Sequence, residues 1–279
     1  MRLETRIEKE LISYNGTMAF YARDFKGNTV AINEKEKFET ASTIKTFILL
    51  ELFEQIRKGR LGLHEKISYE ESHRVDGSGV LHNMDSGFSM SIFNFATLMI
   101  IISDNTATNV MIDLLGKDEI NATIRRYGFE DTKLHNRIDW ECYDVLGTTT
   151  AKDYGDFFYK LYRNELVDET SCRTMTEIFK KQHYNSMITR CFPQYYLSGD
   201  DCIAETSEQI EVASKSGSMN ACRNDGGIVF TPVGAYVISM FHKDFHDPLY
   251  HMDHEASLYG AKVSRMVLDG FLALGGSLV

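Results

Sequence analysis

Segments with the pattern of β-strands occur near both ends of this chain, and a long stretch with the pattern of helices separates them. Two such segments, at 17–25 and 29–34, flank the turn-forming residues 26–28 and predict a hairpin. Three more lie at 210–217, 226–232 and 234–242. Because strands need neighbours and a covered face, the two ends of the chain are expected to build one α/β unit.

The stretch between these ends is predicted to be helical. Apolar residues from about Thr43 to Lys58 cover nearly the whole circumference of a helix, which is typical of a buried one. Further helical patterns lie at 90–101, 106–116, 118–128, behind a Thr150 cap, and at 168–182. We predict a discontinuous α/β subdomain and an all-α subdomain inserted into it. The first comprises 1–37 and 205–279, with terminal helices over 2–13 and from about 253 to 274, and the second comprises 38–204.

The composition excludes some classes of partner. The chain has 279 residues, 43% of them hydrophobic, and a formal net charge of −10. A chain of this length can bury a large core. No run of Lys and Arg forms a basic patch, so neither a nucleic acid nor an anionic membrane surface is an expected partner.

Two features bear on the cellular compartment. The N-terminal segment MRLETRIEKELISY is charged and lacks the apolar stretch of a secretion signal, and the apolar run from Phe95 is too short to cross a membrane. The cysteines are scattered without a CxxC pair, which indicates free thiols in a reducing compartment and gives no zinc-ligand spacing. They are Cys142, Cys172, Cys191, Cys202 and Cys222. The sequence as given predicts a cytoplasmic protein, although a secreted protein whose signal had been removed would look the same.

The segment FETASTIKTFIL places Ser42 three residues before Lys45, at the start of the buried helix. Residues three apart share a helix face, and the N–H groups of a helix N-terminus create a positive potential. A lysine whose pKa is lowered by burial and nearby positive charge can take the proton of a serine and make it a nucleophile. The same residues also fit a helix cap followed by an ordinary surface lysine, and this motif alone leaves both interpretations open.

A second motif, Ser103-Asp104-Asn105, interrupts a run of apolar helix-forming residues. Three polar residues at this place cannot all be buried without hydrogen-bond partners. In a cleft, the Ser103 hydroxyl could relay a proton and the Asn105 amide could hold a carbonyl group. The alternative is a plain helix end, in which Ser103 or Asp104 caps the next helix.

A third motif, Lys215-Ser216-Gly217-Ser218, follows the strand-like IEVA. A glycine in a strand lets a ligand approach the backbone, whose N–H groups can bind an oxyanion or a carboxylate. An exposed strand with a bulge is the other interpretation.

Ser-x-x-Lys, Ser-Asp-Asn and Lys-Thr-Gly, in this order, are the signature of class A β-lactamases and penicillin-binding proteins, and Ser216 keeps the hydroxyl of the threonine. The chain resembles this family over nearly its whole length, most of all in FETASTIKTFIL and MIIISDNTATNVMIDLLG. The resemblance implies a β-lactamase-like fold of class α/β plus all-α. It consists of an antiparallel five-stranded sheet, flanking N- and C-terminal helices and an inserted helical subdomain, with the active site between the subdomains.

The resemblance also implies a serine hydrolase that forms an acyl-enzyme on Ser42, in the first place a β-lactamase. Lys45 would be the neighbouring base, and Ser103 would pass a proton to the leaving nitrogen. Asn105 would hold the side-chain amide of the substrate. The remaining roles would fall to the strand region: Lys215, Ser216 and Arg223 for the substrate carboxylate, Gly217 for close approach, and the N–H groups of Ser42 and Ser218 for the oxyanion hole.

The same resemblance implies a monomer that acts on a small molecule, either a β-lactam or an acyl-D-amino-acid peptide or ester, with no cofactor and no metal. The alternatives are a penicillin-binding D-peptidase or esterase with slow deacylation, and a non-catalytic ligand-sensing module.

Deacylation depends on one further residue. The family has a loop with a glutamate that activates the hydrolytic water, before the segment that matches TTTAKD, and here Trp140-Glu141 look like the expected pair. Only six residues separate Glu141 from Thr148, fewer than the family usually has, and the asparagine expected downstream is absent. Glu141 is therefore the base, a displaced residue or a surface carboxylate. An acyl-enzyme would persist if Glu141 is misplaced.

The segment FHKDFHDPLYHMDHE contains four histidines and three aspartates. These residue types can bind metal ions. However, the segment joins a strand to the last helix and contains Pro248, so we predict a solvated connection and no metal site. The histidines are His242, His246, His251 and His254.

Overall fold

The computed structural model describes residues 2–142, 145–197 and 210–279, and the chain divides into two compact units. Unit 1 consists of Met1–Phe38, Thr150–Tyr159 and Asn185–Val279, and unit 2 of Glu39–Thr149 and Lys160–Tyr184. Unit 1 thus also contains Thr150–Tyr159, and its C-terminal stretch begins at Asn185, whereas the division from the sequence began that stretch at 205.

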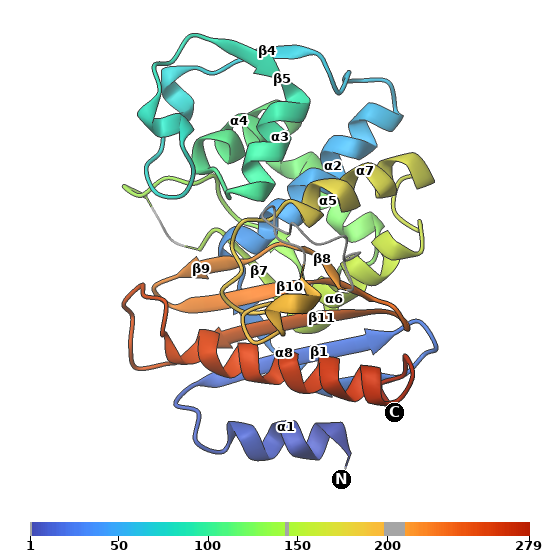
Figure 1. Ribbon diagram of the computed structural model, residues 1–279. Coiled ribbons are helices and arrows are strands. Elements are labelled where there is room, and N and C mark those ends of the chain that lie inside the picture. The colour runs from blue at the N-terminus through green and yellow to red at the C-terminus, as the bar shows by residue number, and fades with distance from the viewer. Residues whose placement is uncertain (1, 143–144, 198–209) are drawn as a thin grey trace. The chain divides into compact units, whose positions relative to one another are not determined.

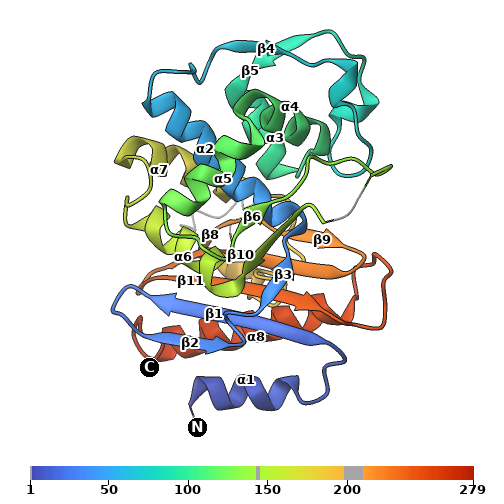
Figure 2. The ribbon, with the colours of Figure 1, turned by 180° about the vertical axis from the view of Figure 1, so that it is seen from behind.

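An antiparallel sheet forms the centre of unit 1 (Figures 1 and 2). The strand order is β2-β1-β11-β10-β8, and β9 also pairs with β10. The strands are β1 Thr17–Asp24, β2 Thr29–Ile32, β8 Glu211–Ser214, β9 Gly217–Met219, β10 Cys222–Thr231 and β11 Gly234–Lys243. The predicted five-stranded antiparallel sheet is confirmed, with β8 and β9 sharing the fifth position because Lys215 and Ser216 interrupt the strand.

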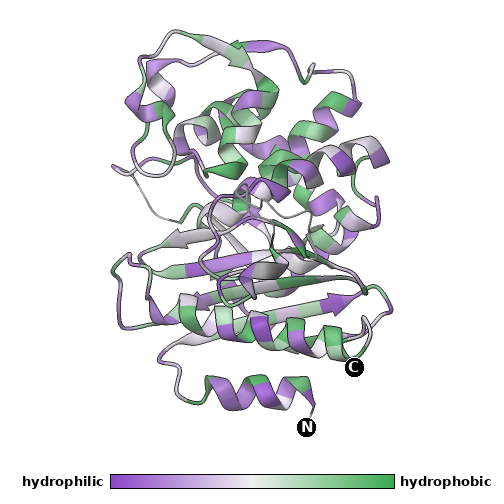
Figure 3. Cartoon of the chain, in the orientation of Figure 1, coloured by the Kyte–Doolittle hydropathy of each residue, from purple (hydrophilic) through white to green (hydrophobic). Residues whose placement is uncertain are grey.

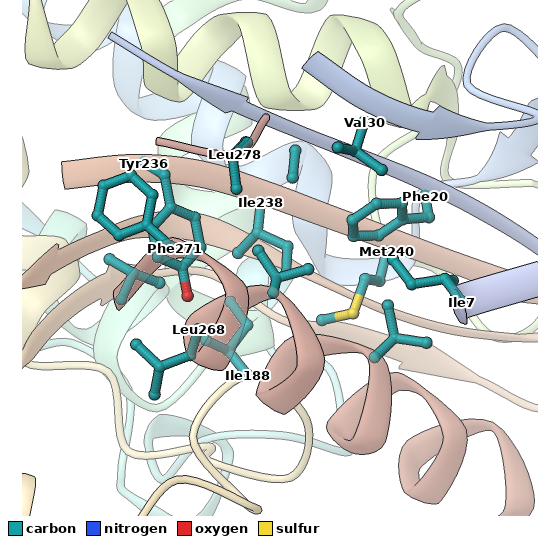
Figure 4. Close-up of a cluster of buried hydrophobic side chains, with 14 of the residues drawn as sticks. Ile7, Phe20, Val30, Ile188, Tyr236, Ile238, Met240, Leu268, Phe271 and Leu278 are labelled. Atoms are coloured by element: carbon teal, nitrogen blue, oxygen red, sulfur yellow. The ribbon is translucent and has the colours of Figure 1, made fainter. Parts of the chain in front are cut away.

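Helices α1 Leu3–Leu11 and α8 Glu255–Ala273 pack against each other, and with the strands they enclose a hydrophobic core. Figure 4 shows Phe20 of β1 near Met240 of β11 and Ile7 of α1 at one end of this core, and Tyr236 of β11 beside Phe271 of α8 at the other. Both helices are amphipathic, as Figure 3 shows for α8 with its mixture of hydrophobic and hydrophilic residues. The last helix begins at Glu255, two residues later than predicted, because the His254 ring caps it by accepting a hydrogen bond from Ala256 N–H (3.1 Å).

The first turns of α6, Ala151–Tyr162, also belong to unit 1. The Tyr154 ring contacts the ring of Phe241 at a centroid distance of 5.4 Å, and the Ser239 hydroxyl donates to the Ala151 carbonyl at 2.5 Å. Thr150 caps this helix as predicted, because its hydroxyl accepts a hydrogen bond from Asp153 N–H (3.1 Å).

Unit 2 is mainly helical. Its helices are α2 Lys45–Arg57, α3 Ile92–Ile101, α4 Asn105–Leu115, α5 Lys117–Arg126 and α7 Glu169–Lys180, together with the end of α6. The remaining strands are short: β3 Lys37–Glu39, β4 Lys66–Ser68, β5 Ser89–Ser91, β6 Lys133–Leu134 and β7 Gly147–Thr150. Strands β4 and β5 pair within 64–90, where the sequence shows no pattern.

Helix α2 is buried on every side, as its apolar pattern predicts. Its buried carboxylates have partners: Glu54 lies 3.0 Å from Arg57 and 3.1 Å from Arg126, and Glu51 accepts hydrogen bonds from Thr123 and Gln55. The second half of this helix is therefore held by side chains within unit 2. None of the helices in the described ranges is long and apolar enough to cross a membrane.

Candidate active site

Ser42 lies in a 3₁₀ turn, Ala41–Ile44, that continues directly into α2 at Lys45. Ala41 has a φ of 43°, a left-handed conformation that costs a non-glycine residue about 1–2 kcal/mol and is typical of sites where a backbone is held in place. Neither the turn nor α2 has a side-chain cap, so the interpretation of Ser42 as a helix cap is wrong. Ser42 is half-buried, and within the described residues its hydroxyl has no hydrogen-bond partner.

Lys45 is completely buried, so the interpretation as a surface lysine is wrong too. Its Nζ donates to the Ser103 carbonyl (2.7 Å), to Ser103 Oγ (3.0 Å) and to Asn105 Oδ1 (2.9 Å). Residues three apart in a 3₁₀ turn are eclipsed, which places Ser42 and Lys45 on one side of the turn. The amine of Lys45 thus joins the first motif to the second.

In the Ser-Asp-Asn segment the predicted helix end is confirmed, and the roles of Ser103 and Asn105 toward a substrate stay a prediction. Asp104 is the N-cap of α4, and its Oδ1 accepts a hydrogen bond from Ala107 N–H (2.8 Å). Ser103 has a φ of 55°, and both its carbonyl and its hydroxyl contact Lys45. The Asp104 cap therefore fixes the backbone that carries both Ser103 and Asn105.

A loop at 76–79 also contacts this motif, and no motif in the sequence indicates this contact. The Asp76 carbonyl accepts a hydrogen bond from Asn105 Nδ2 (3.1 Å), and the Ser78 carbonyl accepts one from Asn105 N–H (2.9 Å). Val80 and Leu81 donate their N–H groups to Asp104 Oδ2 at 2.7 and 3.0 Å. The signal that the sequence does contain is a pair of glycines, Gly77 and Gly79, whose φ values are 105° and 102°.

The third motif lies in unit 1, between β8 and β9. Lys215 N–H donates to the Gly226 carbonyl (3.0 Å), and Tyr154 Oη donates to the Lys215 carbonyl (2.6 Å). The Lys215 side chain is completely buried and Nζ donates to the Ser216 carbonyl (2.6 Å), so the interpretation as an exposed strand is wrong. Burial lowers the pKa of Lys215 to about 7, and the charge of Asp225 acts in the opposite direction.

Arg223 lies on β10, opposite Ser218 of β9. Its guanidinium donates to the carbonyl groups of Met219, Cys222 (2.9 Å) and Leu249 (2.9 Å). It also lies 5.3 Å from the ring of Phe245 and 5.1 Å from that of Tyr250. Arg223 thus holds the loop that follows β11, and its contact with a substrate carboxylate stays a prediction.

Glu141 is exposed, and its backbone N–H donates to Asp139 Oδ1 (3.0 Å). Its carboxylate has no hydrogen bond or ion pair to any residue that the structure describes. The neighbouring Trp140 donates its indole N–H to the Asp76 carbonyl (3.0 Å), and Ile138 exchanges two hydrogen bonds of 2.9 Å with the Asn109 amide. The loop is therefore anchored before Glu141, and the role of Glu141 in deacylation stays a prediction.

The histidines after β11 have separate structural contacts. His242 is completely buried, with Nδ1 3.1 Å from Tyr14 Oη; His251 Nε2 lies 2.6 Å from Asp247 Oδ2; and His254 caps α8. Within the described ranges, no group of three or more His, Cys, Asp or Glu residues is placed to hold a metal ion. Cys142, Cys172, Cys191 and Cys222 are free thiols, and Cys202 lies outside the described residues.

The structure thus brings Lys45, Ser103 and Asn105 of unit 2 into one hydrogen-bonded group, one turn from Ser42. In unit 1 it holds a buried lysine, Lys215, on the backbone beside Gly217 and Ser218. An amine that contacts the Ser103 hydroxyl, in the turn after a serine, is an arrangement that can relay a proton from a nucleophile.

Comparison with known proteins identifies the relatives of this chain. The model of a family described as the beta-lactamase enzyme family matches residues 2–271. Beta-lactamase 1 of Bacillus cereus is 25% identical over 256 residues, which cover 88% of this chain and 77% of that protein. Beta-lactamase SME-1 of Serratia marcescens is 25% identical over 139 residues, 49% of this chain and 46% of that protein. The match thus spans only about half the length of some curated relatives.

Solved structures agree over the whole chain. A beta-lactamase from Sphaerobacter thermophilus superimposes with a TM-score of 0.84 at 25% identity and covers 97% of both chains. The structure of PBP-A superimposes with a TM-score of 0.83 at 27% identity, covering 97% of this chain and 96% of PBP-A. The fold is therefore that of beta-lactamases and of PBP-A.

Proposed function

Because the chain belongs to the beta-lactamase enzyme family, we propose that it is a serine hydrolase that opens β-lactams through an acyl-enzyme on Ser42. The observation that supports this most is the buried amine of Lys45, which contacts Ser103 Oγ at 3.0 Å and Asn105 Oδ1 at 2.9 Å. A lysine in this position is costly to bury unless its amine has partners, and these partners are the groups that an acyl transfer needs.

The proposed reaction has two stages. The first stage requires Lys45 as the neutral amine, which donates at most two hydrogen bonds and has a lone pair. Its Nζ takes the proton of Ser42 Oγ, and Ser42 Oγ attacks the lactam carbonyl. The C–N bond then breaks, and the nitrogen takes a proton from Ser103 Oγ. Lys45 Nζ gives a proton back to Ser103 Oγ across their hydrogen bond of 3.0 Å. In the second stage, water attacks the ester carbonyl on Ser42, the bond from that carbon to Ser42 Oγ breaks, and a proton from the water returns to Ser42 Oγ as the opened product leaves. The same route serves other activated acyl groups, so the lactam is the substrate class that the family indicates.

We propose that the residues of unit 1 bind the substrate. A buried ammonium attracts a carboxylate far more strongly than an exposed one does, and Lys215 is completely buried. Its neighbours Ser216, Gly217 and Ser218 supply hydroxyl and backbone N–H groups. The N–H groups of Ser218 and of Ser42 are the two proposed oxyanion donors. Arg223 is part of this proposal because it pairs with Ser218 across β10 and β9.

The test is incubation with a chromogenic cephalosporin and with a penicillin, followed by colour and by the intact mass of the protein over time. Steady colour release with an acyl adduct on wild-type protein, both lost in Ser42→Ala, is the expected result. The control is Ser13→Ala, which changes an exposed serine in the turn after α1 and should leave both readouts intact. Turnover that survives Ser42→Ala would refute the proposal.

The same assay decides the role of Glu141. PBP-A, whose fold this chain shares, has been captured in variant form as an acyl-enzyme complex with penicillin-G. If Glu141 is the deacylating base, Glu141→Gln should make the adduct persist where the wild type releases it. If the wild-type adduct already persists, and Glu141→Gln changes nothing, the chain is a slowly deacylating penicillin binder.

The proposal includes a monomer acting on a small molecule. Sedimentation of the purified protein at several concentrations checks the oligomeric state, and a mass that rises with concentration would contradict it. The cytoplasmic or secreted location stays a prediction.

A further inference from the structure

The amide of Asn105 is held at both ends. Its Oδ1 accepts a hydrogen bond from Lys45 Nζ (2.9 Å), and its Nδ2 donates to the carbonyl oxygen of Asp76 (3.1 Å). A primary amide has two N–H donors, so among the described residues Asp76 engages one of them and the other remains for a ligand. The orientation of the remaining N–H is therefore fixed by the loop that carries Asp76.

The same carbonyl oxygen has a second donor. Trp140 Nε1 donates to the Asp76 oxygen at 3.0 Å, and a carbonyl oxygen has lone pairs for both donors. Trp140 stands beside Glu141, in the loop that Asn109 anchors at Ile138. One backbone atom thus links the Asn105 amide to the loop of the suspected deacylating residue.

Gly77 leaves the space that this arrangement needs. Its φ is 105°, and a Cβ at this position would lie 2.8 Å from Asn105 Nδ2 and 3.6 Å from Trp140 Cζ2. The first distance is shorter than real Cβ contacts allow, and the amide is pinned from the other side by Lys45. Any side chain at residue 77 would therefore displace the Asn105 amide or the loop.

We propose that the corner at Asp76 and Gly77, braced by Trp140, determines substrate specificity by orienting the Asn105 amide toward the side-chain amide of the substrate. Gly77 and Trp140 are positioning residues, because they act through Asn105. The inference rests on the proposed function, in which Asn105 holds that group. It predicts that substrates with a side-chain amide depend on the corner and that substrates without one do not.

The test compares two alanine substitutions at glycines with similar backbones. Gly77→Ala and Gly87→Ala both place a side chain at a positive φ, 105° and 90°, but a Cβ at residue 87 meets nothing within 4 Å. The second-order rate of Ser42 acylation is measured by intact mass with benzylpenicillin, which has a side-chain amide, and with 6-aminopenicillanic acid, which has a free amine instead. In Gly77→Ala we expect the acylation rate with benzylpenicillin to fall about tenfold, because one oriented hydrogen bond is lost. We expect little change for 6-aminopenicillanic acid and for either substrate in Gly87→Ala.

Trp140 gives a readout that does not depend on turnover, because it is the only tryptophan of the chain. Gly77→Ala should shift its fluorescence emission, since the indole loses its acceptor, and Gly87→Ala should not. Trp140→Phe, which keeps a ring and removes the N–H, should reproduce the selective loss with benzylpenicillin. Equal losses for both substrates, or unchanged emission in Gly77→Ala, would overturn the inference. If neither substrate acylates wild-type Ser42, the proposed function itself fails, and the emission shift still reports whether the corner holds Trp140.

Discussion

At the scale of single residues, two buried lysines have different surroundings. Lys45 donates to Ser103 and Asn105, which are neutral acceptors, whereas Lys215 has the Ser216 carbonyl at 2.6 Å and the charge of Asp225 nearby. Asp225 is itself buried, and its Oδ1 accepts a hydrogen bond from Gly226 N–H (2.9 Å) and its Oδ2 one from Ile188 N–H (3.2 Å). Burial raises the pKa of Asp225 to about 7 and lowers that of Lys215 to about 7. The charge of this pair therefore changes near neutral pH.

This titration predicts a pH dependence of substrate binding. Lysine loses its charge as the pH rises through its pKa, so KM for a β-lactam carboxylate should rise above about pH 7. In Asp225→Asn the negative charge that favours the ammonium is gone, the pKa of Lys215 falls further, and the rise in KM should begin at lower pH. The measurement is KM against pH for a cephalosporin, with an activated ester that lacks a carboxylate as control. An unmoved profile in Asp225→Asn, or an equal shift with the ester, would contradict this role.

At the scale of elements, Asp104 does more than an ordinary helix cap. Asp104 and Asp168 cap α4 and α7 with similar bonds of 2.8 Å, to Ala107 N–H and Ser171 N–H. Asp104 Oδ2 additionally accepts the N–H groups of Val80 and Leu81, which hold the loop from Asp76. This cap therefore stabilises both a helix and the loop beside the candidate site.

The two caps are a matched pair for measurement. Asp168→Ala should lower the free energy of unfolding by about 1 kcal/mol, the usual value for a cap. Asp104→Ala should lower it by about 2 kcal/mol more, because two further N–H donors lose their acceptor, the one of Leu81 in a buried place and the one of Val80 in a partly buried place. Denaturant unfolding of both variants checks this. Equal losses would mean that the Val80 and Leu81 bonds contribute nothing.

Elements also mark the limit of what the sequence could predict. The longer strands of the sheet, such as β1, β10 and β11, and the long helices have enough residues for a period to appear, and they were predicted. Strands β4 and β5 have three residues each, too few for a period. The motif spacing singled out Ser42 and Lys45, but the contact of Lys45 with Ser103, 58 residues away, is set by the packing of α2 against α3 and α4. The contact of Asn105 with Asp76 could not be predicted either, because any residue has a backbone carbonyl and the sequence gives no sign of which one is used.

At the scale of the whole molecule, acid should destabilise unit 1 through His242. Burial lowers the pKa of His242 from 6.5 to about 3, with a smaller contribution from His254. Between pH 6.5 and 3 the unfolded chain therefore binds a proton that the folded chain does not, and stability is lost as the pH falls. The expected slope is about 1.4 kcal/mol per pH unit.

The test is His242→Phe, which keeps a ring in the core and removes the titration. Unfolding by guanidinium is followed by far-UV circular dichroism at several pH values between about 3.5 and 7. The free energy of unfolding of the wild type, relative to that of the variant, should fall by about 1.4 kcal/mol for each unit of pH below about 6. A difference that stays constant with pH would show that His242 is not the acid-sensitive group.

The sheet of unit 1 has a consequence for synthesis on the ribosome. Thr17 of β1 pairs with Lys243 of β11, so the first strand that leaves the ribosome can pair with β11 only after the last strand of the described residues has been made. A lone hairpin of β1 and β2 is marginally stable, and its unpaired edge can pair with other chains. Unit 2 ends at Tyr184, so the turn that carries Ser42 can fold while β11 is still unmade. A stalled or truncated chain would therefore present an ordered helical unit together with an open, aggregation-prone β1 edge.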